Sequence, residues 1–274
     1  MSLILKLTLL GAIAVGCIEG HGYMVSPAAR NSAWRFGFGT PANYNDNELY
    51  CGGRTVQHGR NGGRCGVCGD PWDVPEPRPH ERGGRFGRGV ITETYTEGQV
   101  IPVTIHMSAN HRGHYEFRLC NNNNPNAKDS QRCLDKQLLE LADGSGTRYA
   151  LEGGIRGRHT VHVQLPPKLS CSHCVLQWTW VAGNNWGYCP DGTGRNGCGP
   201  QETFVNCADV RILQKGQVTN GSNSNSSSGN NNSVRPLKPN SGPKKPVYKK
   251  PYYPPGWKQS RTGASSPWQN ILRG

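Results

Sequence analysis

Short runs of alternating hydrophobic and polar residues fill the chain from about residue 98 to residue 213. They are rich in β-branched and aromatic side chains, and turns with Pro or Gly separate them, which is typical of half-buried strands. The clearest predicted strands are 100–107, 115–120, 159–165, 175–181 and 208–213. One short helix is predicted, at 134–141. Several short strands without a long amphipathic helix predict an all-β fold, an antiparallel β-sandwich of the immunoglobulin or fibronectin-III type.

Residues 21–98 lack this alternation and are rich in Gly, Pro, Asn and Arg. Such a composition predicts long loops with short helical turns. Cys51, Cys65 and Cys68 lie where they could pin these loops to the rest of the domain. Because long loops inside a compact domain usually have a function, we expect functional residues in this region.

The first 20 residues have the pattern of a secretory signal peptide, with Lys6 near the start, an apolar stretch from Leu7 to Val15, and then small and polar residues ending in Gly20. We therefore expect cleavage after Gly20 and secretion to the extracellular space. The alternative, a membrane anchor or a buried helix, fits less well because the apolar stretch is shorter than the roughly 18 residues of a membrane span. No later segment of the sequence approaches that length, so no membrane association is expected.

After about residue 214 the sequence loses its hydrophobic periodicity. Residues 214–234 are predicted to form an Asn/Ser-rich linker, and residues 235–274 a basic, disordered tail rich in Pro and aromatic residues. Sequons beginning at Asn220, Asn225 and Asn231 predict N-glycosylation of the linker. The tail is a candidate for contact with extracellular matrix or acidic glycans, although a solvated tail would have the same composition.

The formal net charge of +13 belongs mostly to this tail. Residues 214–274 contain ten Lys or Arg and no Asp or Glu, whereas residues 21–213 contain twenty basic and seventeen acidic residues. A body near charge balance, in a chain expected to be exported, argues against nucleic-acid binding. We expect a monomer.

Removal of the leader would leave an even number of cysteines, which in an exported chain indicates disulfide bonds. The ten are Cys51, Cys65, Cys68, Cys120, Cys133, Cys171, Cys174, Cys189, Cys198 and Cys207. A zinc ribbon is the alternative for the two Cys-x-x-Cys pairs. About a hundred residues separate those pairs, however, against the usual ~15–20. The sequence leaves the disulfide connectivity open.

Cleavage after Gly20 would make His21 the first residue, and a terminal histidine offers a metal two nitrogens, the α-amine and the ring Nδ1. A further ligand is needed, and His111, just after the strand predicted at 100–107, is the strongest candidate, with His114 competing for the role. Imidazole and amine donors favour copper, and Cu(II) has the highest affinity of the divalent first-row metals. The sequence therefore predicts a site for one copper ion.

These features together resemble the copper-dependent lytic polysaccharide monooxygenases, specifically the animal group known as auxiliary activity family fifteen. The resemblance covers about residues 21–213 and rests on four segments. They are His21-Gly22 after the leader, Arg64–Asp70 (RCGVCGD), Ala109–His111 (ANH) and Gln201–Val210 (QETFVNCADV).

The resemblance implies that His21 and His111 hold the copper. It places Phe204 in the axial position, where many members of the family have tyrosine, and Ala109 on the opposite axial face. Glu202 corresponds to a polar residue that is expected to hydrogen-bond oxygen at the metal. With phenylalanine at position 204, no phenol at that position can coordinate the metal or be oxidised.

The implied activity is oxidative cleavage of β-1,4-glycosidic bonds by hydroxylation at C1, at C4 or at both. It requires an external reductant and hydrogen peroxide or dioxygen as co-substrate, and it needs no pair of catalytic carboxylates. The expected partner is an insoluble polysaccharide, chitin ahead of cellulose, because the similar proteins are animal proteins whose setting is rich in chitin. The alternative is a non-catalytic chitin-binding or cuticle-matrix protein.

Aromatic residues divide into two groups by position. Trp178 and Trp180 share one face of a predicted strand and are expected in the core. Tyr23, Trp34 and Tyr44 are expected in loops near His21 and are the candidates for stacking on a flat polysaccharide surface.

Overall fold

The longest strands, β8 (Cys171–Val181) and β11 (Thr203–Leu213), pair antiparallel inside a five-stranded sheet. The computed structural model describes residues 21–124 and 126–216. The predicted leader, nearly all of the predicted linker with its sequons, and the predicted tail lie outside the described residues. Within the described ranges, no helix is long and apolar enough to cross a membrane.

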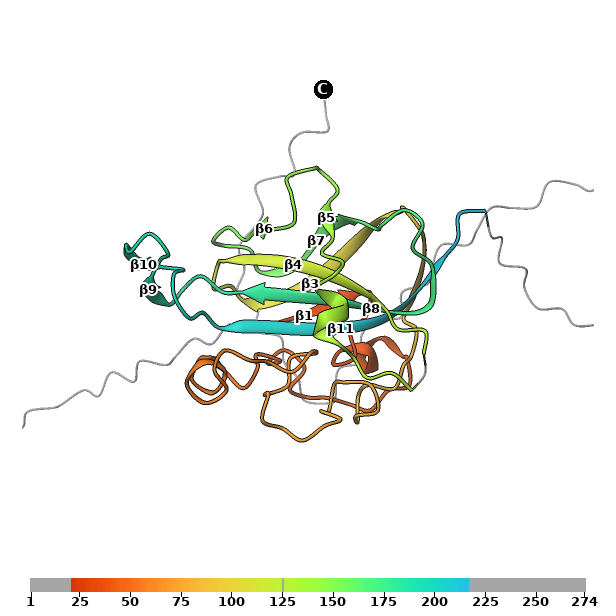
Figure 1. Ribbon diagram of the computed structural model, residues 1–274, viewed down its shortest axis with the longest axis horizontal. Coiled ribbons are helices and arrows are strands. Elements are labelled where there is room, and N and C mark those ends of the chain that lie inside the picture. The colour runs from red at the N-terminus through yellow and green to blue at the C-terminus, as the bar shows by residue number, and fades with distance from the viewer. Residues whose placement is uncertain (1–20, 125, 217–274) are drawn as a thin grey trace, which may run out of the picture. The chain divides into compact units, whose positions relative to one another are not determined.

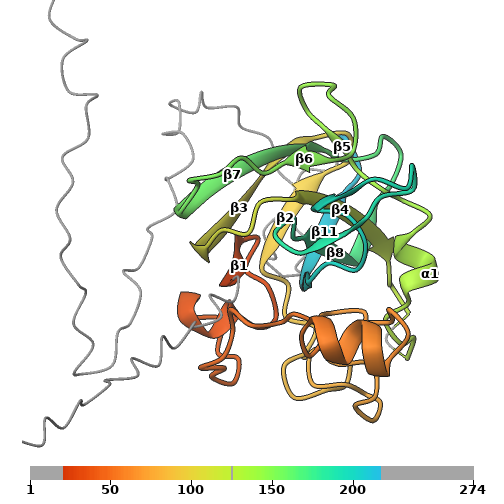
Figure 2. The same cartoon turned by 90° about the vertical axis from the view of Figure 1, so that its left-hand side faces the viewer.

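Two sheets face each other across the core (Figures 1 and 2). The five-stranded sheet has the order β2-β11-β8-β4-β6 and the four-stranded sheet the order β1-β3-β7-β5. Besides β8 and β11, the five-stranded sheet contains β2 (Glu93–Thr96), β4 (His114–Asn121) and β6 (Tyr149–Ala150). The four-stranded sheet contains β1 (His21–Ser26), β3 (Val100–Ala109), β7 (Gly157–Gln164) and β5 (Glu140–Leu141). The predicted β-sandwich is confirmed, and one pair, β11 with β2, is parallel.

The five predicted strands correspond to β3, β4, β7, β8 and β11. A separate hairpin of β9 (Trp186–Tyr188) and β10 (Gly194–Asn196) follows β8. The loops predicted for residues 21–98 are present before β2 and contain the short helices η1 (Ala33–Phe36) and η2 (Thr55–Arg60). The same prediction is wrong at its two ends, where β1 and β2 form by pairing with β3 and β11.

The helix predicted at 134–141 is wrong. A single turn, α1 (Gln131–Leu134), ends where that helix would begin. The next residues pair with β4 instead: Leu119 donates its N–H to the carbonyl of Gln137, and Leu139 donates to that of Phe117. The pairing buries Leu139 in the core. Tertiary hydrogen bonding and burial therefore override a weak local helical pattern.

β8 and β11 are buried on both faces, and even polar residues such as Gln177, Asn206 and Asp209 are buried there. One face contributes Leu176, Trp178 and Trp180 of β8 to the core between the sheets. The opposite face places Val175 and Cys207 in a second cluster under the loops and α1. The loops of residues 21–98 are therefore a cover for the sheet.

All ten predicted cysteines form disulfides, which confirms the disulfide interpretation over zinc. The pairs are Cys51–Cys65, Cys68–Cys207, Cys120–Cys133, Cys171–Cys174 and Cys189–Cys198. The second pair links residues 139 positions apart and fastens the loop cover to β11. A disulfide that closes so long a loop lowers the conformational entropy of the unfolded chain. In the chain-entropy model this stabilises the folded state by about 4–5 kcal/mol.

A buried ion cluster also joins the loop cover to β11. The Arg30 guanidinium donates to both oxygens of Asp209 at 2.8 and 2.7 Å, and it also pairs with Asp129. His173 lies 2.7 Å from Asp209 through its Nε2. Burial by itself raises the pKa of Asp209, but the adjacent Arg30 charge and its hydrogen bonds outweigh burial and hold that pKa well below its ordinary value.

We predict that Asp209→Asn lowers the free energy of unfolding by about 3–5 kcal/mol, because it leaves Arg30 with an incomplete set of buried partners. A carboxyl group with a depressed pKa in the folded state stabilises the fold above about pH 4 and loses this contribution as the pH falls. Denaturant unfolding near pH 7 and near pH 3 should therefore show a smaller acid loss for the variant. The exposed Asp143→Asn should change stability by less than about 1 kcal/mol; an equal effect of both variants would contradict the assignment.

Candidate metal centre

The pairing of β1 with β3 brings His21 to the end of the four-stranded sheet. His21 lies opposite Ala109, the last residue of β3, and the Ser108 hydroxyl donates to the His21 carbonyl at 3.2 Å. His111 follows Ala109 by two residues. The strand register therefore places the two predicted histidine ligands at the same end of the sandwich.

The loop that holds His111 is fastened to the end of β8 from both sides. Gly183 donates its N–H to the His111 carbonyl at 2.9 Å, and the Trp180 indole donates to the Arg112 carbonyl at 2.7 Å. The loop then turns through Gly113, whose φ of +88° favours glycine. A Cβ at Gly113 would lie 1.9 Å from the Val181 carbonyl oxygen, so only glycine allows this close approach.

The start of β11 brings Glu202 and Phe204 to the same end. Glu202 is buried, and one of its carboxylate oxygens lies 3.4 Å from His111 Nδ1. Phe204 is fully buried, with its ring stacked on Trp180 at 4.7 Å between centroids and on Tyr50 at 5.9 Å. The structure thus gathers the predicted residues from the end of β3, the following loop and the start of β11.

His21 makes a carboxylate contact of its own. Its Nε2 lies 2.8 Å from Glu48 Oε1, in a loop that the sequence does not single out. Neighbouring Asn47 accepts the Gly22 N–H through its carbonyl at 3.1 Å. Each of the two predicted histidines therefore has one carboxylate beside it, Glu48 for His21 and Glu202 for His111.

The nitrogen donors at this end suit a copper ion. His111 Nδ1 is buried and makes no hydrogen bond among the described residues, although a Glu202 carboxylate oxygen lies 3.4 Å away, so the polar groups here are not fully satisfied by one another. Imidazole donors favour copper. Within the described ranges, no three or more His, Cys, Asp or Glu side chains form a group that could hold a metal ion. The predicted donor set is of a different kind, since it combines two histidine side chains with a backbone amine.

The competing ligand His114 lies in β4, with its Nε2 3.7 Å from a Glu116 carboxylate oxygen. Glu116 also accepts hydrogen bonds from Arg118 and Arg148. The adjacent His114 ring and the hydrogen bonds from the two arginines hold the pKa of Glu116 well below its ordinary value, although burial opposes them. His114 is thus part of a separate ionic network.

The predicted surface aromatics meet around Arg35. Its guanidinium lies 4.5 Å from the Trp34 ring centroid and 5.6 Å from that of Tyr23. Trp34 in turn contacts Tyr44 edge-on at 5.3 Å, and Tyr44 is 78% exposed. Residues 44–48 run from Tyr44 of this aromatic cluster (Tyr23, Trp34 and Tyr44) to Glu48, so one loop links the cluster to the carboxylate beside the candidate ligand His21.

Sequence reasoning missed a second exposed aromatic pair. Trp186 and Tyr188 on β9 are 56% and 69% exposed, and their rings meet edge-on at 5.0 Å. The Cys189–Cys198 disulfide closes the hairpin, which projects beyond the end of β8 (Figure 1). The signal in the sequence is two aromatics on alternate positions, directly before a cysteine.

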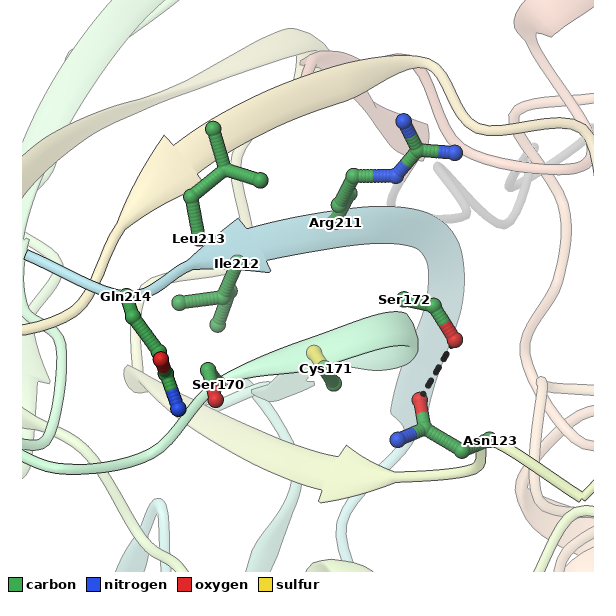
Figure 3. A pocket seen from close by; sticks show the side chains of 8 residues that line it. All are labelled: Asn123, Ser170, Cys171, Ser172, Arg211, Ile212, Leu213 and Gln214. Atoms are coloured by element: carbon green, nitrogen blue, oxygen red, sulfur yellow. Dashed lines mark hydrogen bonds between the residues drawn. The ribbon is translucent and has the colours of Figure 1, made fainter. Parts of the chain in front are cut away.

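A pocket of about 300 Å³ lies at the opposite ends of β8 and β11 (Figure 3). Its lining includes Asn123, Ser172 and Arg211, and Ser172 donates to Asn123 at 3.1 Å. The candidate metal centre adjoins Val181 and Thr203, at the other ends of the same strands. The pocket is therefore separate from the metal centre.

Comparison with known proteins finds one family and similar solved structures. The family model described as "lytic polysaccharide mono-oxygenase, cellulose-degrading" matches residues 21–210. Among solved structures, the lytic polysaccharide monooxygenase AA15 from Thermobia domestica in the Cu(I) state is 50% identical, with a TM-score of 0.69, covering 70% of this chain and 99% of that one. A chitin binding domain from Burkholderia pseudomallei is 14% identical, with a TM-score of 0.39, covering 71% of this chain and 100% of that one. No curated protein sequence matches.

We predict that Gly113→Ala displaces the His111 loop, because the new Cβ would collide with the Val181 carbonyl in a backbone conformation that already disfavours alanine. The expected cost is about 1–3 kcal/mol of stability from backbone strain alone, with weaker metal binding in addition. Gly144→Ala is the matched control, since Gly144 has φ +74° but nothing within 4 Å of a new Cβ. Thermal unfolding and copper titration of both variants test this. Equal metal binding by the two variants would contradict it.

Proposed function

Because this chain belongs to the lytic polysaccharide mono-oxygenase family, we propose that it is a secreted enzyme that oxidatively cleaves β-1,4-glycosidic bonds in chitin, with cellulose as the other substrate. The general activity of the family is copper-dependent oxidation of polysaccharides by a monooxygenase. The supporting observation is the gathering of His21, His111 and Glu202 at one end of the sandwich.

Two histidines and one amine would hold the copper: His21 through its α-amine and Nδ1, and His111 through its ring. The α-amine becomes available after cleavage behind Gly20. When bound and reduced by an external donor, copper supplies the redox chemistry that activates hydrogen peroxide or dioxygen for hydroxylation at C1 or C4.

The neighbouring side chains have roles that need no redox change of their own. Glu202 places a buried carboxylate beside His111, where it can accept or hold a proton during the reaction. Phe204 fills the space next to the ligands with a packed ring, which excludes water from that side. Ala109 lies opposite His21 in the strand pairing, where its small side chain would leave room beside a bound metal.

The polysaccharide would lie across the exposed aromatics on either side of the centre. The aromatic cluster around Arg35 reaches His21 through residues 44–48. The β9–β10 hairpin is linked to the His111 loop by two backbone hydrogen bonds. Gly197, directly after β10, donates its N–H to the carbonyl of Asn185, and Gly183, two residues before Asn185, donates its N–H to the carbonyl of His111. Sugar rings stack on exposed aromatic faces. Chitin is proposed ahead of cellulose because of the similarity to animal proteins whose setting is rich in chitin.

We predict that the processed, copper-loaded protein releases oxidised oligosaccharides from chitin in the presence of a reductant, detectable by mass spectrometry as aldonic acids or C4-oxidised products. His111→Ala should abolish this release, because it removes one of the two histidine ligands. The control is His162→Ala, an exposed position on β7, which should leave the products unchanged. Parallel incubation with cellulose decides between the substrates.

Release of the same products by His111→Ala would contradict the proposed site. Tight chitin binding without oxidised products from the copper-loaded wild type would favour the alternative, a non-catalytic chitin-binding or cuticle-matrix protein.

We also predict that Tyr44→Ala and Trp186→Ala each weaken retention on chitin several-fold, since an aromatic contact contributes about 0.5–1.5 kcal/mol. Copper affinity should not change, because the contacts of Tyr44 and Trp186 seen within the described residues are with Trp34 and Tyr188 and not with a candidate ligand. Val100→Ala is the matched control, as Val100 is 44% exposed at the other end of β3. Pull-down with insoluble chitin measures the effect, and loss of retention by the control alone would exclude these surfaces.

A further inference from the structure

Glu48 approaches the candidate ligand His21 on the ring nitrogen that the proposed copper site does not use. Its Oε1 lies 2.8 Å from His21 Nε2, and both side chains are partly buried, at 23% exposure for His21 and 30% for Glu48. The proposed site uses the other ring nitrogen, Nδ1. The contact is therefore compatible with a bound metal, and it survives cleavage because it does not involve the α-amine.

The backbone on both sides of Glu48 is held in place. Asn47 accepts the Gly22 N–H of β1, and Leu49 accepts the Val205 N–H of β11 at 2.9 Å. Cys51, three residues further along, is fixed by its disulfide to Cys65. Glu48 thus lies on a segment fastened between the two sheets, so its carboxylate has a defined position relative to His21.

A neutral imidazole has one protonated nitrogen and one lone-pair nitrogen. An Nε2–H that donates to a carboxylate leaves Nδ1 as the lone-pair nitrogen, and it also fixes the plane of the ring. Carboxylate partners of this kind orient metal-bound histidines and strengthen them as donors.

We propose that Glu48 is a positioning residue, which holds His21 in the Nε2–H tautomer and so presents Nδ1 to copper. The proposal rests on the proposed function, since it assigns a role toward the same metal. It separates the two carboxylates of the site: Glu48 orients a ligand from behind, whereas Glu202 faces the buried Nδ1 of His111.

The competing explanation is an ordinary ion pair that only stabilises the loop. A partly exposed pair of this kind contributes about 0–1 kcal/mol to stability and would not affect metal binding. The measurement must therefore report on the His21 ring and on the metal, in addition to folding.

The test compares Glu48→Ala and Glu48→Gln in the protein secreted with its own leader. We expect Glu48→Ala to bind Cu(II) about 10–100-fold more weakly in a competition titration, with an altered Cu(II) electron paramagnetic resonance spectrum. Glu48→Gln should lose less affinity, because its amide oxygen can still accept from Nε2–H. In the metal-free proteins, ¹⁵N NMR of the His21 ring should show the Nε2–H tautomer in the wild type and a mixture in Glu48→Ala.

Glu152→Ala is the charge-matched control. Glu152 is exposed at the same end of the molecule, where its carbonyl accepts from Asn110, and its removal should leave copper affinity unchanged. Wild-type affinity and spectrum in Glu48→Ala would overturn the proposal, and so would an equal loss in Glu152→Ala. A wild type that binds copper and oxidises chitin while Glu48→Ala binds copper equally well refutes only the positioning role. A processed wild type that binds no copper refutes the proposed function as well.

Discussion

The hydrogen-bonded register between β1 and the end of β3 is the constraint on which the candidate centre depends. It puts His21 opposite Ala109, the last residue of β3. Only Asn110 separates Ala109 from His111. A shift of the register by one residue would turn the side chains of β1 to the opposite face. Met24 resists such a shift because it is fully buried in the core, and its N–H donates to the side chain of Asn206 on the other sheet.

The loop cover supplies the other half of the centre. Its segment around residues 44–51 is hydrogen-bonded to β1 through Asn47 and to β11 through Leu49. The Cys68–Cys207 disulfide and the Arg30–Asp209 pair fasten the rest of the cover to the outer face of β11. Loops without regular structure can therefore place Glu48 and the surface aromatics with little freedom, because covalent and ionic links replace the missing sheet hydrogen bonds.

Sequence reasoning succeeded where residues close together in the chain determine the structure. The alternation in β3 and the clustered aromatics of β8 predict strands, and the even cysteine count predicts disulfides. Six strands were not predicted. β5, β6, β9 and β10 have only two or three residues, which leaves no periodicity to detect, and β1 and β2 lie in the segment 21–98, whose Gly, Pro, Asn and Arg content predicts loops. The helix predicted near residue 134 is wrong because pairing with β4 decides that segment. The motifs predict His21, His111, Glu202 and Phe204 as site residues, and these roles stay predictions. Glu48 was not predicted because its partner His21 is distant in sequence, and Trp186 was not predicted because its exposure is set by the fold.

The packing around position 204 explains why phenylalanine suits this chain. The rings of Tyr50, Phe204 and Trp180 form a continuous stack that ends at His111, 6.2 Å from Trp180 between centroids. Phe204 is fully buried in this stack. A tyrosine hydroxyl at the same position would need a hydrogen-bond partner or lose its solvation without compensation. The apolar ring avoids that cost, and it leaves the nitrogen donors and Glu202 as the polar groups beside the metal position.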